Sequence, residues 1–152
     1  MKIVLFLVVA LVLSALLWVR LSPNDSAAWN TDPLTATRTT QGGWLVRPQG
    51  GDAAATPVAM LAAEMLAILD RIALDTPRTT RLSGSVAEGR ITYITRSALL
   101  GFPDFTTVSA IALPDGTQPV LFARQRFGDG DMGVNRARVE DWLARLATAL
   151  AP

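Results

Sequence analysis

Residues 3–19 form a run of apolar side chains that is broken only by Ser14. As a helix this run would be about 25 Å long, which is at the lower limit for crossing the hydrocarbon of a bilayer. A secretory signal has a similar basic start and apolar core but ends in small residues, whereas this run ends with Trp18 at the expected interface, close to Arg20. The sequence therefore predicts an uncleaved transmembrane anchor over residues 1–20, with a cleaved and secreted chain as the alternative.

The charges that flank this run set its expected orientation. The amino terminus and Lys2 outweigh Arg20, and the more basic flank of a membrane helix stays in the cytoplasm. We therefore expect a single-pass protein of the inner (cytoplasmic) membrane, with its N-terminus inside and the rest of the chain in the periplasm. Residues 21–40 are rich in Ser, Pro, Asn, Asp and Thr, and this composition predicts a flexible tether before one globular domain over residues 41–152.

The globular part has the residue alternation and the turn residues of a small antiparallel sheet. Five short runs rich in β-branched and aromatic residues are predicted strands: 44–47, 80–86, 90–95, 106–113 and 120–126. One helix is expected to begin at Thr56-Pro57 and run past Ile72, and a second to follow an N-cap at Asn135. The fold class is therefore α+β, with about four to five strands covered by two amphipathic helices and preceded by one transmembrane helix.

Three features of the composition limit the chemistry of the domain. The chain has no Cys and no His, and its single lysine is Lys2. These absences exclude zinc sites of Cys and His, histidine acid/base catalysis and Schiff-base lysines. Apart from Lys2 and Arg20, the chain has 12 basic and 13 acidic residues, and this balance does not supply the basic face that nucleic-acid binding requires.

The loop before the last predicted helix contains glycines and aspartates at spacings that suggest two kinds of ligand site. Residues 128–133 match the glycine pattern of dinucleotide-binding loops, but no second strand is predicted after the helix, and two aspartates would repel a pyrophosphate. The loop also partly matches a calcium-binding loop, but Gly133 and Val134 stand where a ligand and the turn glycine belong. We therefore expect a tight turn, with no cofactor and no metal ion.

Arginines gather on both sides of this loop. Arg124 and Arg126 alternate on one predicted strand and so share a face of the sheet, while Arg136 and Arg138 lie in the first turn of the last helix. Cations at a helix N-terminus oppose the helix dipole, so an anion or a carboxylate is expected beside them. An internal salt-bridge network and a ligand site both satisfy this expectation. The candidate binding residues are Arg96, Arg126, Asp131, Asn135, Arg136 and Arg138.

Two carboxylates suggest an alternative function. Asp104 ends the stiff aromatic turn Gly101-Phe102-Pro103, and Asp131 lies in the glycine-rich loop. Each is a candidate partner for the arginines, and Asp104 is also a candidate cap of its own turn. As a pair they form a candidate catalytic dyad for acid/base hydrolysis.

Two segments of the chain together resemble a known bacterial family. The first is Thr95-Arg96-Ser97 with Gly101-Phe102-Pro103-Asp104, and the second is Arg126-Phe127-Gly128 with the stretch from Asp131 to Arg138. On these motifs, about residues 29–150 resemble the domain of unknown function 1499 family, and this resemblance implies no particular reaction. Relatives often carry serines between the arginines before the glycine loop, where this chain has Ala123 and Gln125, so a serine nucleophile is not expected there.

These observations lead to one preferred hypothesis and one alternative. The preferred hypothesis is a membrane-anchored, extracytoplasmic module of the cell envelope that catalyses no reaction and contacts the membrane through residues 3–19. Its arginine-rich face would recognise an anionic ligand or an envelope protein, or support the envelope. The alternative is a hydrolase that uses Asp104 and Asp131, which requires at least one of these acids in an open cleft with a raised pKa.

Overall fold

The computed structural model describes residues 1–37 and 42–151, which form helices and one sheet. The helices are α1 (Lys2–Leu21), α2 (Ser26–Trp29), α3 (Ala62–Leu74) and α4 (Val134–Leu150), and the strands are β1 (Trp44–Val46), β2 (Thr79–Ser85), β3 (Arg90–Arg96), β4 (Pro103–Leu113) and β5 (Gly116–Gln125). The predicted α+β class is confirmed, and each predicted strand is present with ends shifted by a few residues.

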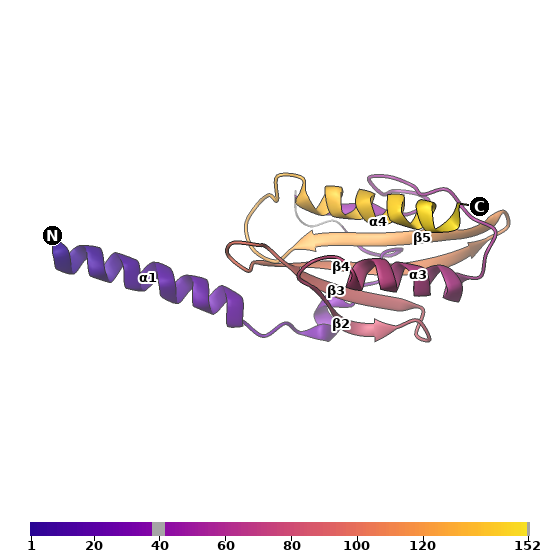
Figure 1. The fold of residues 1–152 in the computed structure, drawn as a ribbon. Coiled ribbons are helices and arrows are strands. Elements are labelled where there is room, and N and C mark those ends of the chain that lie inside the picture. The colour runs from indigo at the N-terminus through magenta and orange to yellow at the C-terminus, as the bar shows by residue number, and fades with distance from the viewer. Residues whose placement is uncertain (38–41, 152) are drawn as a thin grey trace.

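The strands form one antiparallel sheet in the order β1-β5-β4-β3-β2. The four strands from β2 to β5 are neighbours in sequence as well as in space, which is the arrangement that short connections favour. Helices α3 and α4 cover one face of this sheet (Figure 1). The core lies between these two layers, where the Tyr93 ring meets Trp142 edge to face with 5.6 Å between ring centroids.

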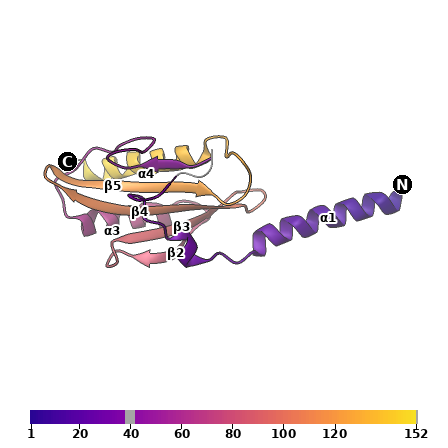
Figure 2. The same ribbon diagram turned by 180° about the vertical axis from the view of Figure 1, so that it is seen from behind.

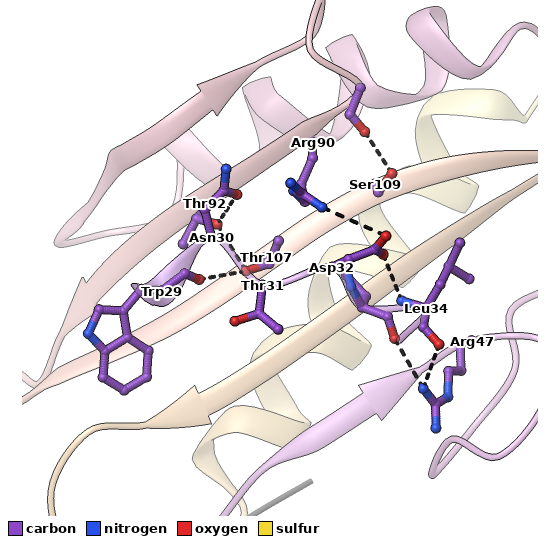
Figure 3. Close-up of polar contacts among 12 residues, drawn as sticks. Trp29, Asn30, Thr31, Asp32, Leu34, Arg47, Arg90, Thr92, Thr107 and Ser109 are labelled. Atoms are coloured by element: carbon purple, nitrogen blue, oxygen red, sulfur yellow. Dashed lines mark hydrogen bonds and ion pairs between the residues drawn. The ribbon is translucent and has the colours of Figure 1, made fainter. Parts of the chain in front are cut away.

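Residues 26–36, which we call the strap, cross the opposite face of the sheet (Figure 2). The Trp29 ring stacks on Phe105 with 3.8 Å between centroids, and Thr92 donates a hydrogen bond of 2.8 Å to the Asn30 side chain (Figure 3). At the end of the strap, Ala36 is buried in a second, smaller apolar cluster on this face. The strap therefore covers apolar and polar side chains that the helices leave open.

Arginine side chains fix the strap by donating to its backbone carbonyls. Arg47 Nη1 lies 2.8 Å from the Leu34 oxygen and 3.1 Å from the Ala36 oxygen, and Arg124 Nη2 donates to the Trp29 oxygen. A flexible tether was predicted over 21–40, but the described part of this segment makes specific contacts instead. Its Pro and Asn content rules out a long helix without preventing an extended chain from packing on a sheet.

The first helix of the domain begins later than predicted. Val58 and Thr117 exchange two backbone hydrogen bonds of 2.8 Å each, so the residues after Thr56-Pro57 lie extended beside the start of β5. Helix α3 starts only at Ala62, where the Glu64 carboxylate accepts the Leu61 N–H. A local N-cap signal was overridden here by pairing with a distant strand.

The last helix begins at Val134, one residue before the predicted N-cap. Gly133 precedes it with φ of 82°, a left-handed conformation that glycine adopts without strain. Asn135 is therefore inside the first turn, where it is fully buried and donates through Nδ2 to the Gly42 oxygen at 2.9 Å. The prediction of Asn135 as the N-cap is wrong, because the residue serves a long-range contact instead.

Helix α1 extends away from the sheet and has no buried residue (Figure 1). It is long and apolar enough to cross a membrane. A signal sequence at the N-terminus would have the same length and composition. Its last turns touch the domain, because Trp18 meets Phe127 edge to face with 5.9 Å between ring centroids. The end of α1 and the loop after β5 are therefore neighbours.

Candidate functional site

A pocket of about 640 Å³ opens at the end of the domain that faces α1. It lies where β3 and β5 end and where β4 and α4 begin, between the β3–β4 loop (97–102) and the β5–α4 loop (126–133). Its lining residues are Ser97, Ala98, Leu99, Leu100, Phe102, Asp104, Gln125, Phe127, Gly128, Gly130, Asp131, Met132 and Val134. The two motif segments of the sequence therefore form the two walls of one pocket.

The walls of the pocket are mainly apolar and several of their side chains face solvent. Leu99 is 92% exposed, Met132 is fully exposed, and Leu100 and Val134 are also accessible. Phe102 and Phe127 lie 6.3 Å apart between ring centroids, and Phe127 also contacts Trp18 of α1. An apolar surface of this kind that stays open to solvent is typical of a site that meets a ligand, a protein or a lipid.

The floor of the pocket holds a charge pair. Arg138 Nη2 lies 3.0 Å from Asp104 Oδ2, and the two side chains are 9% and 18% exposed. The other end of the guanidinium donates to Asn135 Oδ1 at 2.7 Å, and Asn135 in turn is tied to Gly42. These contacts join β4, α4 and the chain before β1, so they fix the floor.

Burial raises the pKa of Asp104 above its ordinary value. The Arg138 guanidinium opposes this shift and the neighbouring Asp131 adds to it. Asp104 thus has one property that an acid/base catalyst requires, together with a place in the pocket lining. It also has a close counter-ion, Arg138, which stabilises the charged form of Asp104 and so works against its use as a proton donor.

Asp131 acts as the cap of α4. Its Oδ1 accepts the Gly133 N–H at 3.0 Å and its Oδ2 accepts the Asn135 N–H at 2.6 Å. Both oxygens are therefore used by backbone donors that the helix start would otherwise leave unpaired. The carboxylate that pairs with Arg138 is that of Asp104, and Asp131 stabilises the helix start itself.

The candidate arginines do not form one face. Arg96 and Arg126 lie on the strap side of the sheet. Arg138 extends from α4 to Asp104 on the side that the helices cover. Arg136 pairs with Glu140 on the surface of α4 at 2.8 Å. Arg126 donates to the Pro23 oxygen at 3.0 Å and to Asn24 Oδ1 at 2.6 Å. The sheet therefore separates the predicted cluster into two groups.

Comparison with known proteins gives this chain a family. The model of a family described as a protein of unknown function (DUF1499) matches residues 23–146. The chain belongs to this family. The DUF1499 match includes the strap and both walls of the pocket, so these parts belong to the family domain, and the resemblance seen in the sequence motifs is confirmed.

The other two comparisons add little to the DUF1499 assignment. No curated protein matches the sequence. Among solved structures, the crystal structure of protein MLL2253 from Mesorhizobium loti is similar at 13% sequence identity with a TM-score of 0.37, and the match covers 49% of this chain and 60% of that one. The chain thus spans less than two thirds of that protein.

The sequence does not reveal that two arginines of this DUF1499 protein, Arg96 and Arg20, meet at Gly101 beside the pocket. Arg96 Nη1 donates to the Gly101 oxygen at 2.9 Å, and the Arg20 side chain packs on the same glycine, where an added Cβ would lie 3.5 Å from Nη1. The sequence indicates Arg20 only as a flank of the membrane helix. No local pattern relates it to residue 101, because the contact depends on how α1 leaves the domain.

The strap side also holds a buried cation that the sequence did not reveal. Arg124 lies between the rings of Trp29 and Phe122, at 5.3 Å and 4.7 Å from their centroids. Burial lowers the pKa of Arg124 to about 10, so the group stays charged at neutral pH. Its donors reach the Trp29 oxygen and Thr107, which makes it a clamp for the strap.

Proposed function

We propose that this DUF1499 protein is a membrane-anchored, extracytoplasmic binding module whose ligand site is the pocket between the β3–β4 and β5–α4 loops. The observation that carries the proposal is the position of this pocket. Its apolar wall is continuous, through Phe127 and Trp18, with the last turns of a helix suited to a bilayer. Trp side chains commonly mark the level where a membrane helix meets water, so the pocket opens near that level.

The anchoring part of the proposal rests on α1. Its 20 residues reach about 30 Å as a helix, which matches the hydrocarbon thickness. With Lys2 on one side, we place the N-terminus in the cytoplasm, residues 3–19 in the inner membrane and the domain in the periplasm. Intact-mass measurement and labelling from outside test this, because a cysteine introduced at exposed Leu61 would be unique in the chain. A mature chain that starts after Arg20 would overturn the anchor.

A binding role is favoured because the carboxylates of the site are occupied. Asp131 uses both oxygens to cap α4, and Asp104 is paired with Arg138. Arg138 and Arg136 are likewise paired with Asp104 and Glu140, so an anionic partner would meet Arg96 and Arg126 instead. The arginine-rich face expected from the sequence is thereby reduced to Arg96 and Arg126, which contact the two loops of the pocket.

A hydrolase remains the second candidate because of one observation, the raised pKa of Asp104 in the pocket lining. Asp104→Asn separates the two functions. A hydrolase would lose turnover of ester and glycoside substrates with this change, whereas ligand binding to the apolar walls does not require the Asp104 carboxylate. Asp131→Asn is not suited to this test, because it also alters the helix cap.

The occupant of the pocket can be trapped in living cells. A photoreactive amino acid at position 99 replaces a leucine that is 92% exposed, so the fold is not disturbed. The matched control is position 61, which is 68% exposed and lies at the opposite end of the domain, near the bridge between Val58 and Thr117. We expect adducts from position 99 and not from position 61. Equal or absent adducts at the two positions would overturn the pocket as the ligand site.

A further inference from the structure

We infer that the pocket binds an anionic phospholipid of the bilayer that holds α1, with the acyl chain against the apolar walls and the phosphate at an arginine rim. This inference rests on the proposed function and names the ligand class of the same site. Arg20, Arg96 and Arg126, which we call the rim, do not line the pocket itself but contact Gly101 and Phe127 of its two loops. The observations that support it are the unpaired charges of the rim, the apolar walls beside it and the position of both next to α1.

Among the described residues, the three guanidinium groups of the rim have only neutral partners. The ion pairs found within residues 1–37 and 42–151 do not include Arg20, Arg96 or Arg126. Arg96 donates to the Gly101 oxygen, Arg126 donates to the Pro23 oxygen and Asn24, and Arg20 packs on Gly101. Carbonyl partners leave the positive charges uncompensated, and guanidinium groups match the geometry of phosphate oxygens.

The rim and the apolar walls meet at the same loops. Arg96 and Arg20 contact Gly101, which lies between exposed Leu100 and Phe102 of one wall. The Arg126 guanidinium lies over the ring of Phe127, 5.0 Å from its centroid, in the other wall. A site for an amphiphile needs charged groups for its head and an apolar surface for its chain, and both are found here side by side.

The floor of the pocket opposes an anion less strongly than the three arginines of the rim attract it. The charge of Asp104 is balanced by Arg138 at 3.0 Å, so the pair is neutral as a whole. Asp131 keeps its negative charge, which the Gly133 and Asn135 N–H groups at the start of α4 offset only in part. The sign of the ligand is therefore set by the rim, where the three arginines are.

A lipid fits these features better than a soluble anion or a protein segment. The rim includes Arg20, the last basic residue of α1, and Phe127 of the β5–α4 loop contacts Trp18, so the site lies where phosphates of a bilayer would be. A soluble phosphate would leave Leu99 and Met132 exposed to water, whereas an acyl chain covers them. The chemistry that satisfies both parts at this level is an anionic phospholipid.

The test uses the full chain in nanodiscs with a fluorophore on one introduced cysteine, either Leu99→Cys or Leu61→Cys. The chain has no other cysteine, so each label is unique. Traces of nitroxide-labelled phosphatidylglycerol or phosphatidylcholine are added to a phosphatidylcholine disc, and quenching of the fluorophore reports which lipid resides near it. We expect strong quenching at position 99, more by phosphatidylglycerol than by phosphatidylcholine, and little at position 61.

Two rim variants and one control test the headgroup preference. Arg20→Gln and Arg96→Gln should each lower the ratio of phosphatidylglycerol to phosphatidylcholine quenching by about fivefold, since one basic residue at a membrane surface contributes ~1 kcal/mol. Gln at position 96 still has a donor for the Gly101 oxygen. Arg71→Gln removes an exposed arginine of α3, a helix that contributes no residue to the pocket lining, and it should leave the ratio unchanged.

The outcomes separate this inference from the proposed function. Equal quenching by the two lipids at position 99 would overturn headgroup recognition while leaving an apolar binding pocket. No quenching at position 99, with protein adducts in the trapping experiment, would show that the occupant is a protein and overturn the lipid. No quenching and no adducts would overturn both.

Discussion

Replacing Arg138 by alanine should destabilise the domain far more than replacing Arg136, although the two residues are close neighbours on α4. Arg138 and its partner Asp104 are 9% and 18% exposed. Arg136 and its partner Glu140 are more than half exposed. The two substitutions therefore remove the same chemical group from two different environments.

The expected loss follows from what Arg138→Ala leaves behind. Asp104 keeps a partly buried carboxylate without a counter-ion, and Asn135 Oδ1 loses its donor at 2.7 Å. Breaking a buried ion pair costs about 3–5 kcal/mol, and the remaining exposure of Asp104 reduces this to about 2–4 kcal/mol. The melting temperature of the full chain in detergent should fall by about 10 °C. An exposed pair such as that of Arg136 contributes at most about 0.5 kcal/mol.

The loss should shrink as the pH falls. Burial raises the pKa of Asp104 in the native chain and Arg138 opposes that shift, so the pKa should be higher still in the variant. A carboxyl group with a raised pKa binds its proton more tightly in the folded state than in the unfolded state. The variant therefore gains stability as the pH falls from the pKa of Asp104 in the folded chain to its ordinary pKa in the unfolded chain. It loses this stability again as the pH rises through the folded pKa. Thermal melts from neutral to mildly acidic pH measure this trend.

A second substitution decides whether Asp104 is the cause. Adding Asp104→Asn to Arg138→Ala should recover part of the lost stability, because an amide needs no counter-ion. The reasoning would be refuted by equal melting temperatures for the Arg136 and Arg138 variants, or by a double variant that is no more stable than Arg138→Ala.

Three further predictions concern parts that hold the site in place. Asp131→Ala should cost about 1–2 kcal/mol in a thermal melt, because two backbone N–H groups lose their cap. Trp29→Ala should expose the strap, so its amides should exchange hydrogen faster by mass spectrometry while those of α4 remain protected. Gly42→Ala should lower the melting temperature, since its Cβ would lie 2.0 Å from the Gln125 side chain, whereas Gly130→Ala, with open space around it, should have little effect.

The sequence predicted the sheet well because strand signals are local. The alternation that placed Arg124 and Arg126 on one face is a property of any extended chain, and β5 keeps it. The turn residues between the predicted strands 106–113 and 120–126 indicated the hairpin between β4 and β5 in the same way. These features depend on residues a few positions apart.

The predictions that failed concern features that depend on residues far apart in the chain. Thr56-Pro57 has the local form of a helix start, but pairing of Val58 with Thr117 keeps the chain extended there. The strap has the composition of a loop, and the stacking of Trp29 on Phe105 leaves no trace in either segment. The motif residues around Asp104 and Asp131 were recognised, but the division of the arginines between two sides of the sheet requires the order of strands, which spacing does not give.

The hydrogen bonds from Arg126 to Pro23 and Asn24 fix the point at which the chain enters the domain, only a few residues after α1 ends. With α1 in a bilayer, this short connection, which is held by hydrogen bonds, keeps the domain close to the membrane surface. Its search for any partner then takes place in two dimensions, by lateral diffusion in the membrane plane. The encounter rate would depend on surface density in the membrane rather than on concentration in the surrounding compartment.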